Sequence, residues 1–145
     1  MRPVHILLVE DNEGDILLTS EAFEEAKIKT HLSYVKDGKE AIDFVTRQGK
    51  YANAQLPDLL LLDINIPKRN GVEVLKFMKA HAKLRKIPVI MLTTSSSPED
   101  ISRCYENYAN CFITKPIEPE NYQAIVTQIE NFWTSIVTLP VQNGT

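Results

Sequence analysis

Short apolar runs bounded by turn residues recur along the chain, and the clearest is Leu59–Leu62, four consecutive leucines that end at Asp63. A run of this length that is apolar at every position is typical of a strand buried on both faces of a parallel sheet. Pro67 and Gly71 then interrupt the chain before the next helical pattern. Ligands bind at the carboxyl ends of strands in open α/β sheets, so Asp63 stands where chemistry is expected.

The same patterns predict alternating strands and helices along the whole chain. We expect strands at residues 5–9, 30–35, 59–62, 87–93 and 111–114. We expect helices at residues 13–26, 39–47 and 71–80, from residue 99, and at 120–137. This alternation predicts an α/β fold, a five-stranded parallel sheet with helices on both faces. At this size the flavodoxin-like (βα)5 arrangement with strand order 2-1-3-4-5 is favoured.

Length and composition narrow the class of protein. The 145 residues fit one domain, which we place at residues 1–137, with a loose tail at 138–145 and no output domain. A net charge of −3 without a Lys/Arg stripe argues against nucleic-acid binding. No apolar run is long enough for a membrane span and no signal peptide opens the chain, so we expect a cytoplasmic protein. Cys104 and Cys111 are interpreted as small core residues.

The polar residues at the strand ends supply a coherent set of chemical groups. The predicted strand order puts strands one and three side by side, so Glu10 and Asp11 should lie near Asp63. Three carboxylates repel one another and, as oxygen ligands, suit Mg²⁺. A carboxylate beside the metal can act as a nucleophile and form an aspartyl-phosphate. Thr93 ends strand four and Lys115 follows strand five, where a hydroxyl and an ammonium could bind phosphoryl oxygens.

Each of these residues has a commoner explanation when it is taken alone. Asp63 could be a turn residue, Glu10 and Asp11 could cap the following helix together with Asn12, and Lys115 could be a solvated surface charge. The functional interpretation depends on their joint occurrence. Acids, a hydroxyl and a cation stand at the carboxyl ends of four of the five predicted strands, which is the set that metal-assisted phosphoryl transfer requires.

Four segments taken in order resemble the receiver domain of two-component response regulators. They are LVEDN, LDINIP, LT and TKP, at residues 8–12, 62–67, 92–93 and 114–116. The resemblance covers about residues 4–137, nearly the whole chain. It implies that Asp63 is the phosphoacceptor, that Asp11 binds the metal directly, and that Glu10 binds it through water. It also implies that the backbone carbonyl of Asn65 completes the Mg²⁺ site.

The resemblance assigns roles to the fourth and fifth strands as well. Thr93 matches the switch hydroxyl, Lys115 the phosphate-pairing lysine and Phe112 the aromatic switch position. The bond between Lys115 and Pro116 is typically cis in the family. One departure is Glu10 in place of the commoner second aspartate. The other is Thr94, where the family prefers a smaller residue, and we expect it to slow phosphoryl entry, hydrolysis or both.

The resemblance implies a stand-alone response regulator that accepts a phosphoryl group from a histidine kinase onto Asp63. Such a protein catalyses only its own phosphorylation and dephosphorylation, so it is not an enzyme in the ordinary sense. The segment at residues 131–140 and the loop at residues 49–53 resemble the small response regulators paired with cyanobacterial phytochromes, which implies a phytochrome-type kinase. A homodimer is expected through the fourth helix, fifth strand and last helix, and one of the adjacent Phe132 and Trp133 is expected to face outward.

The sequence argues against three other functions. A pseudo-receiver would act as a binding module with a dead site, but the set of Asp11, Asp63, Thr93 and Lys115 is intact. A metal-dependent phosphatase with an aspartyl nucleophile normally needs a second aspartate two residues later, where this chain has Asn65. A flavin or nucleotide carrier would need a Gly-rich loop after the first strand, where acidic residues would instead repel an anion.

Overall fold

The computed structural model describes residues 3–93, 98–116 and 118–144. The strands are β1 (Val4–Val9), β2 (Thr30–Val35), β3 (Leu59–Leu62), β4 (Val89–Thr93) and β5 (Cys111–Thr114). The α-helices are α1 (Glu13–Glu24), α2 (Gly38–Thr46), α3 (Gly71–Ala80), α4 (Pro98–Glu106) and α5 (Tyr122–Gly144). Short 3₁₀ turns at η1 (Gly49–Tyr51) and η2 (Pro119–Asn121) complete the elements.

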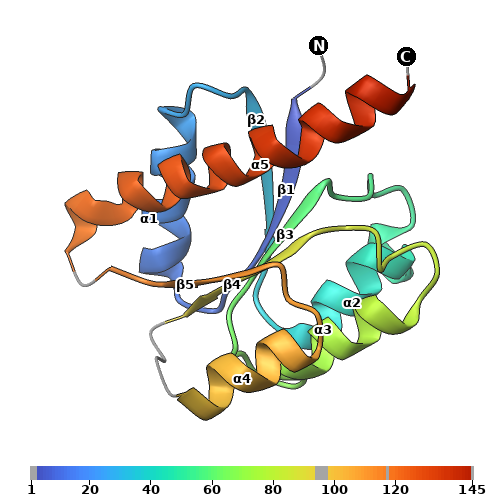
Figure 1. Ribbon diagram of the computed structural model, residues 1–145. Helices are drawn as coiled ribbons and strands as arrows, with labels where there is room; N and C mark the ends of the chain where they lie inside the picture. The colour runs from blue at the N-terminus through green and yellow to red at the C-terminus, as the bar shows by residue number, and fades with distance from the viewer. Residues whose placement is uncertain (1–2, 94–97, 117, 145) are drawn as a thin grey trace.

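The five strands form one parallel sheet in the order β2-β1-β3-β4-β5, which confirms the predicted fold. Helices α1 and α5 lie together on one side of the sheet, whereas α2, α3 and α4 lie on the other (Figure 1). In the register of β1 and β3, Val9 pairs with Leu62. The residues that follow these two strands therefore emerge next to each other at one edge of the sheet.

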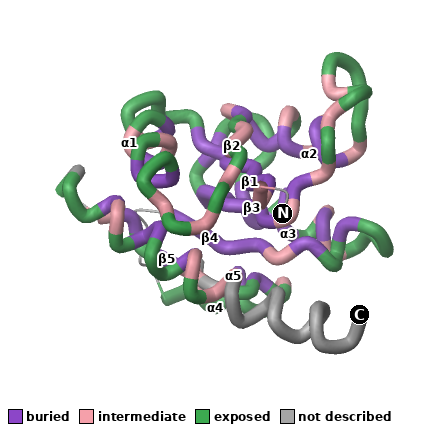
Figure 2. Tube along the Cα trace, turned by 90° about the horizontal axis from the view of Figure 1, so that it is seen from above, coloured by how far each residue is buried: buried purple, intermediate pink, exposed green. Residues whose placement is uncertain are grey.

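The sheet separates two apolar cores, and alternate residues of each central strand enter opposite cores. Leu60 and Leu62 pack with α2, α3 and α4, while Leu59 and Leu61 pack with α1 and α5. All four leucine side chains are fully buried, as the pattern predicted. The central strands appear as the buried layer in the middle of the molecule, with exposed residues on the outer helix surfaces (Figure 2). Among the described residues, no helix combines the length and apolar character that a membrane crossing needs.

Several boundaries differ from those predicted. Strand β4 begins at Val89 and not at residue 87, because Pro88 has no N–H to donate and only its carbonyl joins the sheet, accepting from Leu60 N at 3.0 Å. Helix α1 ends two residues early, at Glu24, and the following segment bonds to α5 through Ile28 N and a Glu130 carboxylate oxygen at 2.9 Å. The described residues contain no cis peptide bond, so the expected cis bond before Pro116 is wrong.

The carboxyl-terminal segment corrects two expectations. Helix α5 runs to Gly144, so residues 138–144 are helical and not a loose tail. No glycine stands between Trp133 and Pro140 to end the helix, and in the structure Pro140 does not end it either. Phe132 and Trp133 are both half-buried and both pack against the core shared by α1 and α5. The expectation that one of this pair faces outward is therefore wrong, because adjacent positions can flank the same core.

A close contact between backbones fixes the loop that carries Asp63. Gly71 opens α3, and its N–H donates to the Ile64 carbonyl oxygen at 2.8 Å. A Cβ at Gly71 would lie 2.2 Å from the Asp63 carbonyl oxygen and 2.7 Å from Ile64 Cα. Only a residue without a side chain allows α3 to start against this loop, so Gly71 helps to set where Asp63 lies.

Gly71→Ala should therefore lower the free energy of unfolding by about 2 kcal/mol, because the new methyl group overlaps backbone atoms that have no room to move. Urea denaturation followed by circular dichroism measures this loss. Gly14→Ala is the matched control, since the nearest atom to its added Cβ is the side-chain Oδ1 of Asn12 at 3.2 Å. Equal stability of the Gly71→Ala variant and the wild type would contradict the tight fit.

Candidate functional site

Two neighbouring strand ends bring Glu10 and Asp63 together. The main-chain N–H of Glu10 donates to the Val35 carbonyl oxygen on β2 at 3.0 Å, and that of Asp63 donates to the Val9 carbonyl oxygen on β1 at 3.2 Å. These sheet-type bonds continue one residue past each strand and leave both side chains at the edge. Glu10 is 2% exposed and Asp63 is 7% exposed, so both carboxyl groups are held in a largely buried site.

A third carboxylate completes an acidic cluster. Oxygens of Glu10, Asp11 and Asp63 all lie within 4.8 Å of one another, and Asp11 is exposed at the rim. The next residue, Asn12, donates its main-chain N–H to Glu10 Oε2 at 3.1 Å and accepts from Asp15 N at 2.8 Å. Asn12 thus caps α1 as predicted, and the same turn holds the Glu10 carboxylate in place.

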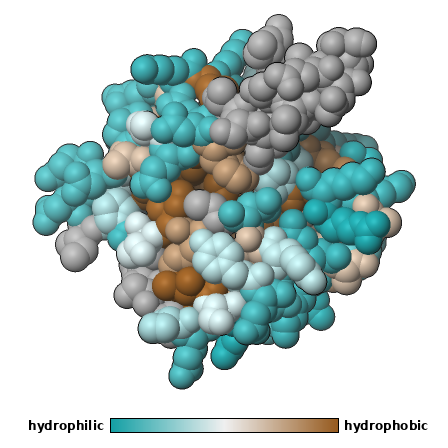
Figure 3. Space-filling model, in the orientation of Figure 1, coloured by the Kyte–Doolittle hydropathy of each residue, from teal (hydrophilic) through white to brown (hydrophobic). Residues whose placement is uncertain are grey.

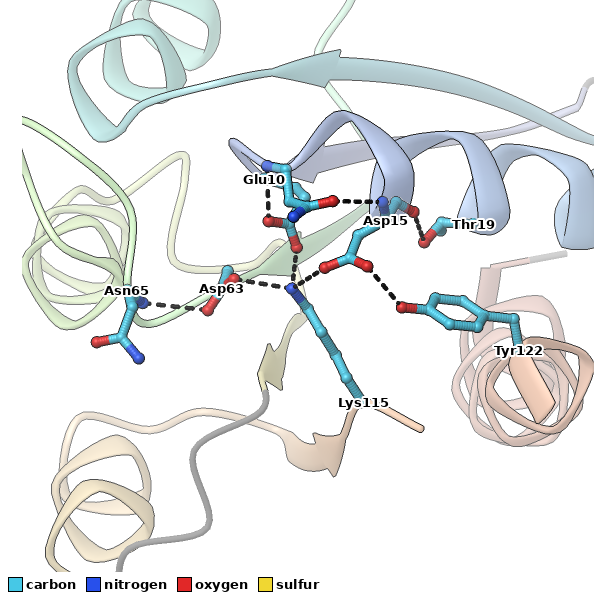
Figure 4. Close-up of polar contacts among 8 residues, drawn as sticks. Glu10, Asp15, Thr19, Asp63, Asn65, Lys115 and Tyr122 are labelled. Atoms are coloured by element: carbon cyan, nitrogen blue, oxygen red, sulfur yellow. Dashed lines mark hydrogen bonds and ion pairs between the residues drawn. The ribbon is translucent and has the colours of Figure 1, made fainter. Parts of the chain in front are cut away.

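Lys115 supplies the positive charge inside this cluster. Its ammonium nitrogen lies 2.9 Å from Asp63 Oδ2, 3.0 Å from Asp15 Oδ2, and in direct contact with Glu10 Oε1 (Figure 4). Lys115 follows β5, and its side chain is almost wholly buried. A buried ammonium needs such partners, and here it is surrounded by carboxylates on several sides.

Burial and the neighbouring charges have opposing effects on the pKa of Glu10 and on the pKa of Lys115. Burial raises the pKa of Glu10 to about 7, against the opposing effect of the Lys115 hydrogen bond and charge. Burial alone would lower the pKa of Lys115, but its hydrogen bonds to Glu10, Asp63 and Asp15 outweigh this and raise the pKa above its ordinary value. Lys115 therefore stays charged at neutral pH, whereas Glu10 has a pKa of about 7.

The structure places the other predicted residues as follows. Asn65 is exposed, and its main-chain N–H donates to Asp63 Oδ1 at 3.1 Å; the predicted role of its carbonyl stays a prediction. Thr93 ends β4, where only its backbone is described, and Thr94 lies outside the described residues. Phe112 is half-buried and packs against the core on the α3 and α4 side of the sheet.

The sequence patterns missed Asp15 and Tyr122. Asp15 in the first turn of α1 bonds Lys115, and its other oxygen accepts a hydrogen bond from Tyr122 Oη at 3.0 Å. A signal existed for Asp15, because side chains in a helix lean toward its amino terminus, which here faces the site. Tyr122 is the first residue of α5 and is buried, and its hydroxyl reaches the site.

The acidic cluster fits a divalent cation. Its donors are carboxylate oxygens, which hard cations prefer, and one of the three carboxylates is open to solvent. Each oxygen that already accepts one hydrogen bond keeps a second lone pair for a metal. The cluster holds three carboxylates against one Lys115 ammonium that is also shared with Asp15. A cation would offset the remaining negative charge.

Comparison with known proteins identifies the family to which the chain is similar. The response regulator receiver domain family matches residues 6–127. Response regulator Rcp1 of Synechocystis sp. is 41% identical over 138 residues, which cover 95% of this chain and 94% of that protein. Probable methanogenesis regulatory protein FilR2 of Methanothrix harundinacea is 39% identical over 131 residues, covering 90% of this chain and 84% of that protein.

Solved structures agree with these relatives. The crystal structure of the phosphorylated cyanobacterial phytochrome response regulator RcpA superposes with a TM-score of 0.87 at 42% identity, covering 93% of this chain and 96% of RcpA. The Mn²⁺-bound form of Rcp1 superposes with a TM-score of 0.84 at 40% identity, covering 90% of this chain and 94% of that chain. The second structure shows that this relative binds a divalent cation.

The shifted pKa of Glu10 predicts how stability depends on pH without a divalent cation. Because the folded-state pKa is raised from 4.5 to about 7, the group's contribution to stability is complete below pH 4.5 and is lost as pH rises through about 7. Relative to Glu10→Gln, the wild type in EDTA should lose on the order of 2 kcal/mol of unfolding free energy between about pH 5 and about pH 8.

Urea titrations at a series of pH values measure this difference. Glu24→Gln removes an exposed carboxylate from the same side of the fold and serves as the control, because it should keep the wild-type slope. Parallel pH profiles for the wild type and Glu10→Gln would show that Glu10 is not a source of the pH dependence.

Proposed function

This chain belongs to the response regulator receiver domain family, and from that premise we propose that it accepts a phosphoryl group from a histidine kinase onto Asp63. The observation that carries the proposal is the contact of 2.9 Å between Asp63 and the buried ammonium of Lys115, at the edge of an acidic cluster. A nucleophilic carboxylate, a cation partner and a metal-binding group then lie within one site.

In the proposed reaction a carboxylate oxygen of Asp63 attacks the phosphorus atom of a phosphohistidine. The N–P bond breaks, its electron pair stays on the imidazole nitrogen, and an O–P bond forms on Asp63. The Lys115 ammonium neutralises charge on a phosphoryl oxygen once the transferred group has arrived. The Asn65 main-chain N–H, which donates to Asp63 Oδ1 at 3.1 Å, orients the attacking carboxylate.

The proposed cation is Mg²⁺, held by Asp11 and Asp63 directly, by Glu10 through water, and by the Asn65 carbonyl. Support comes from the all-oxygen donor set and from the open rim at Asp11, since Mg²⁺ keeps several waters. When bound, Mg²⁺ offsets negative charge on the transferring phosphoryl group. Phosphorylation of Asp63 is proposed to change the surface of the protein through Thr93 and Phe112. Thr93 would act as the phosphate-binding hydroxyl and Phe112 as the aromatic switch.

A phytochrome-type kinase is the proposed phosphoryl source. The support is similarity to RcpA, a cyanobacterial phytochrome response regulator, at 42% identity over nearly the whole chain. A probable methanogenesis regulatory protein is similar at 39% identity, so identity alone does not select the kinase. Phosphotransfer from a phytochrome-type kinase compared with an unrelated histidine kinase tests the pairing, and equal transfer from both would contradict it.

The first test is phosphorylation with acetyl phosphate and Mg²⁺, followed by intact-mass spectrometry. The wild type should gain the mass of one phosphoryl group, and Asp63→Asn should gain none, because an amide is a poor nucleophile. Asp43→Asn, at a half-buried aspartate of α2 that pairs with Lys39, is the matched control and should be labelled like the wild type. Omission of Mg²⁺ should slow labelling at least about tenfold, which corresponds to about 1.4 kcal/mol of transition-state stabilisation.

Labelling that persists in Asp63→Asn would contradict the assignment of the acceptor. No labelling of any folded variant, by either acetyl phosphate or a kinase, would favour the alternative of a pseudo-receiver that binds partners without phosphorylation.

We further propose that the face formed by α4, β5 and α5 mediates a homodimer. On this face hydrophobic residues gather between α5 and α4 (Figure 3). Tyr105 is 50% exposed and Tyr108 is 75% exposed at the α4 edge, so both aromatic rings are available to a partner.

Light scattering with size-exclusion chromatography over a range of concentrations measures the dimer. The mass should approach twice that of the monomer at high concentration, and Tyr105→Ser combined with Tyr108→Ser should weaken association at least about tenfold. Leu17→Ser, on the exposed surface of α1, is the control for loss of an apolar side chain. A monomeric mass at every concentration, with and without phosphodonor, would contradict the dimer.

A further inference from the structure

Lys115 has one partner that lies apart from the acidic cluster. Among the described residues, the carboxylates that converge within 4.8 Å are Glu10, Asp11 and Asp63, and Asp15 is not one of them. Asp15 nevertheless bonds the Lys115 ammonium through Oδ2 at 3.0 Å. Figure 4 shows Asp15 and Asp63 on opposite sides of this nitrogen, with Tyr122 beyond Asp15.

The position of Asp15 is fixed from several directions. Its main-chain N–H donates to Asn12 Oδ1 at 2.8 Å, and its main-chain carbonyl accepts from Thr19 Oγ1 at 2.7 Å. Its second carboxylate oxygen accepts from Tyr122 Oη at 3.0 Å. Because a carboxylate only accepts and Tyr122 must donate here, the hydroxyl and the ammonium hold the two oxygens of Asp15 from either side.

The ammonium of Lys115 has no donor to spare in this arrangement. A lysine ammonium has three N–H groups, and its partners are Glu10, Asp15 and Asp63. A divalent cation bound by the acidic cluster would compete with the ammonium for Glu10 and Asp63. The bond to Asp15 is the one that such a cation leaves untouched.

We propose that Asp15, held by Tyr122, is a positioning residue that keeps the Lys115 ammonium beside Asp63 while the cation occupies the acidic cluster. This inference rests on the proposed function of Asp63 as phosphoacceptor. Asp15 acts through Lys115 and does not touch the reacting atoms. Tyr122 acts through Asp15 and connects the site to α5, which begins 107 residues after Asp15 in the sequence.

The first experiment observes the lysine directly and needs no phosphorylation. In ¹⁵N-labelled protein with saturating Mg²⁺, the buried ammonium should give a slowly exchanging NMR signal, assigned by its absence from Lys115→Met. The signal should persist in the wild type and in Glu13→Gln, and it should broaden beyond detection in Asp15→Asn. Glu13 lies in the same turn of α1, is exposed, and carries the same charge, so it is the matched control.

The second experiment measures phosphorylation by acetyl phosphate at saturating Mg²⁺. Asp15→Asn should slow labelling about tenfold and Tyr122→Phe about threefold, and the double variant should match Asp15→Asn alone, because residues that act in series are not additive. The Mg²⁺ dissociation constant, followed by fluorescence, should change less than about twofold, since Asp15 is outside the metal group. Asp15→Glu should recover part of the lost rate, and Glu13→Gln should match the wild type.

The outcomes separate this inference from the proposed function. A wild type that takes no phosphoryl group contradicts the proposed function, whatever the NMR signal shows. A labelled wild type with an equal rate in Asp15→Asn overturns the positioning role. Multiplicative losses in the double variant would overturn the link through Tyr122, and loss of Mg²⁺ affinity in Asp15→Asn would show that Asp15 acts on the metal. Thermal unfolding of each variant checks that the fold is retained.

Discussion

The site depends on the ion pairs that the buried ammonium of Lys115 makes with its carboxylate neighbours. The ammonium contacts three carboxylates that would otherwise be held together in a poorly solvated place at a high cost in free energy. The arrangement is still unbalanced, because Asp11 adds a further negative charge at the rim. This excess of negative charge makes the site receptive to a divalent cation, and in the cation's absence burial, with a smaller contribution from the Asp63 charge, raises the pKa of Glu10.

The parallel sheet explains why these groups meet at all. Burial on both faces favours apolar residues throughout β3 and at residues 6–9 of β1, and the carboxylates of the site come directly after these two stretches. The pairing of Val9 with Leu62 then fixes the next residues, Glu10 and Asp63, side by side. Gly71 at the start of α3 packs against the backbone of the Asp63 loop so closely that a side chain would not fit. The positions of Glu10 and Asp63 are thus set by backbone contacts, and the side-chain interactions of the site depend on these positions.

Much of this could be predicted from the sequence because it follows from local pattern and from strand order. The leucine run, the capping Asn12 and the strand-end acids each have a direct signature, and β3, β5 and α3 have the predicted bounds. The end of α5 and the packing of Phe132 and Trp133 were predicted wrongly, because they depend on how much of the core one helix can cover. Asp15 and Tyr122 were missed because their contact joins residues 107 positions apart, and no local pattern specifies such a pair.

The Asp15 contact gives the site an asymmetry that the acidic cluster alone would lack. A cation and an ammonium that share the same carboxylates compete for them, and the cation carries the larger charge. A lysine bound only to Glu10 and Asp63 would be displaced as the metal enters. An oxygen outside the metal group, fixed by the α1 cap and by Tyr122, lets both positive charges occupy the site together. In the proposed reaction the two charges would then both act on one phosphoryl group, and a movement of Lys115 would also change a bond that reaches α5.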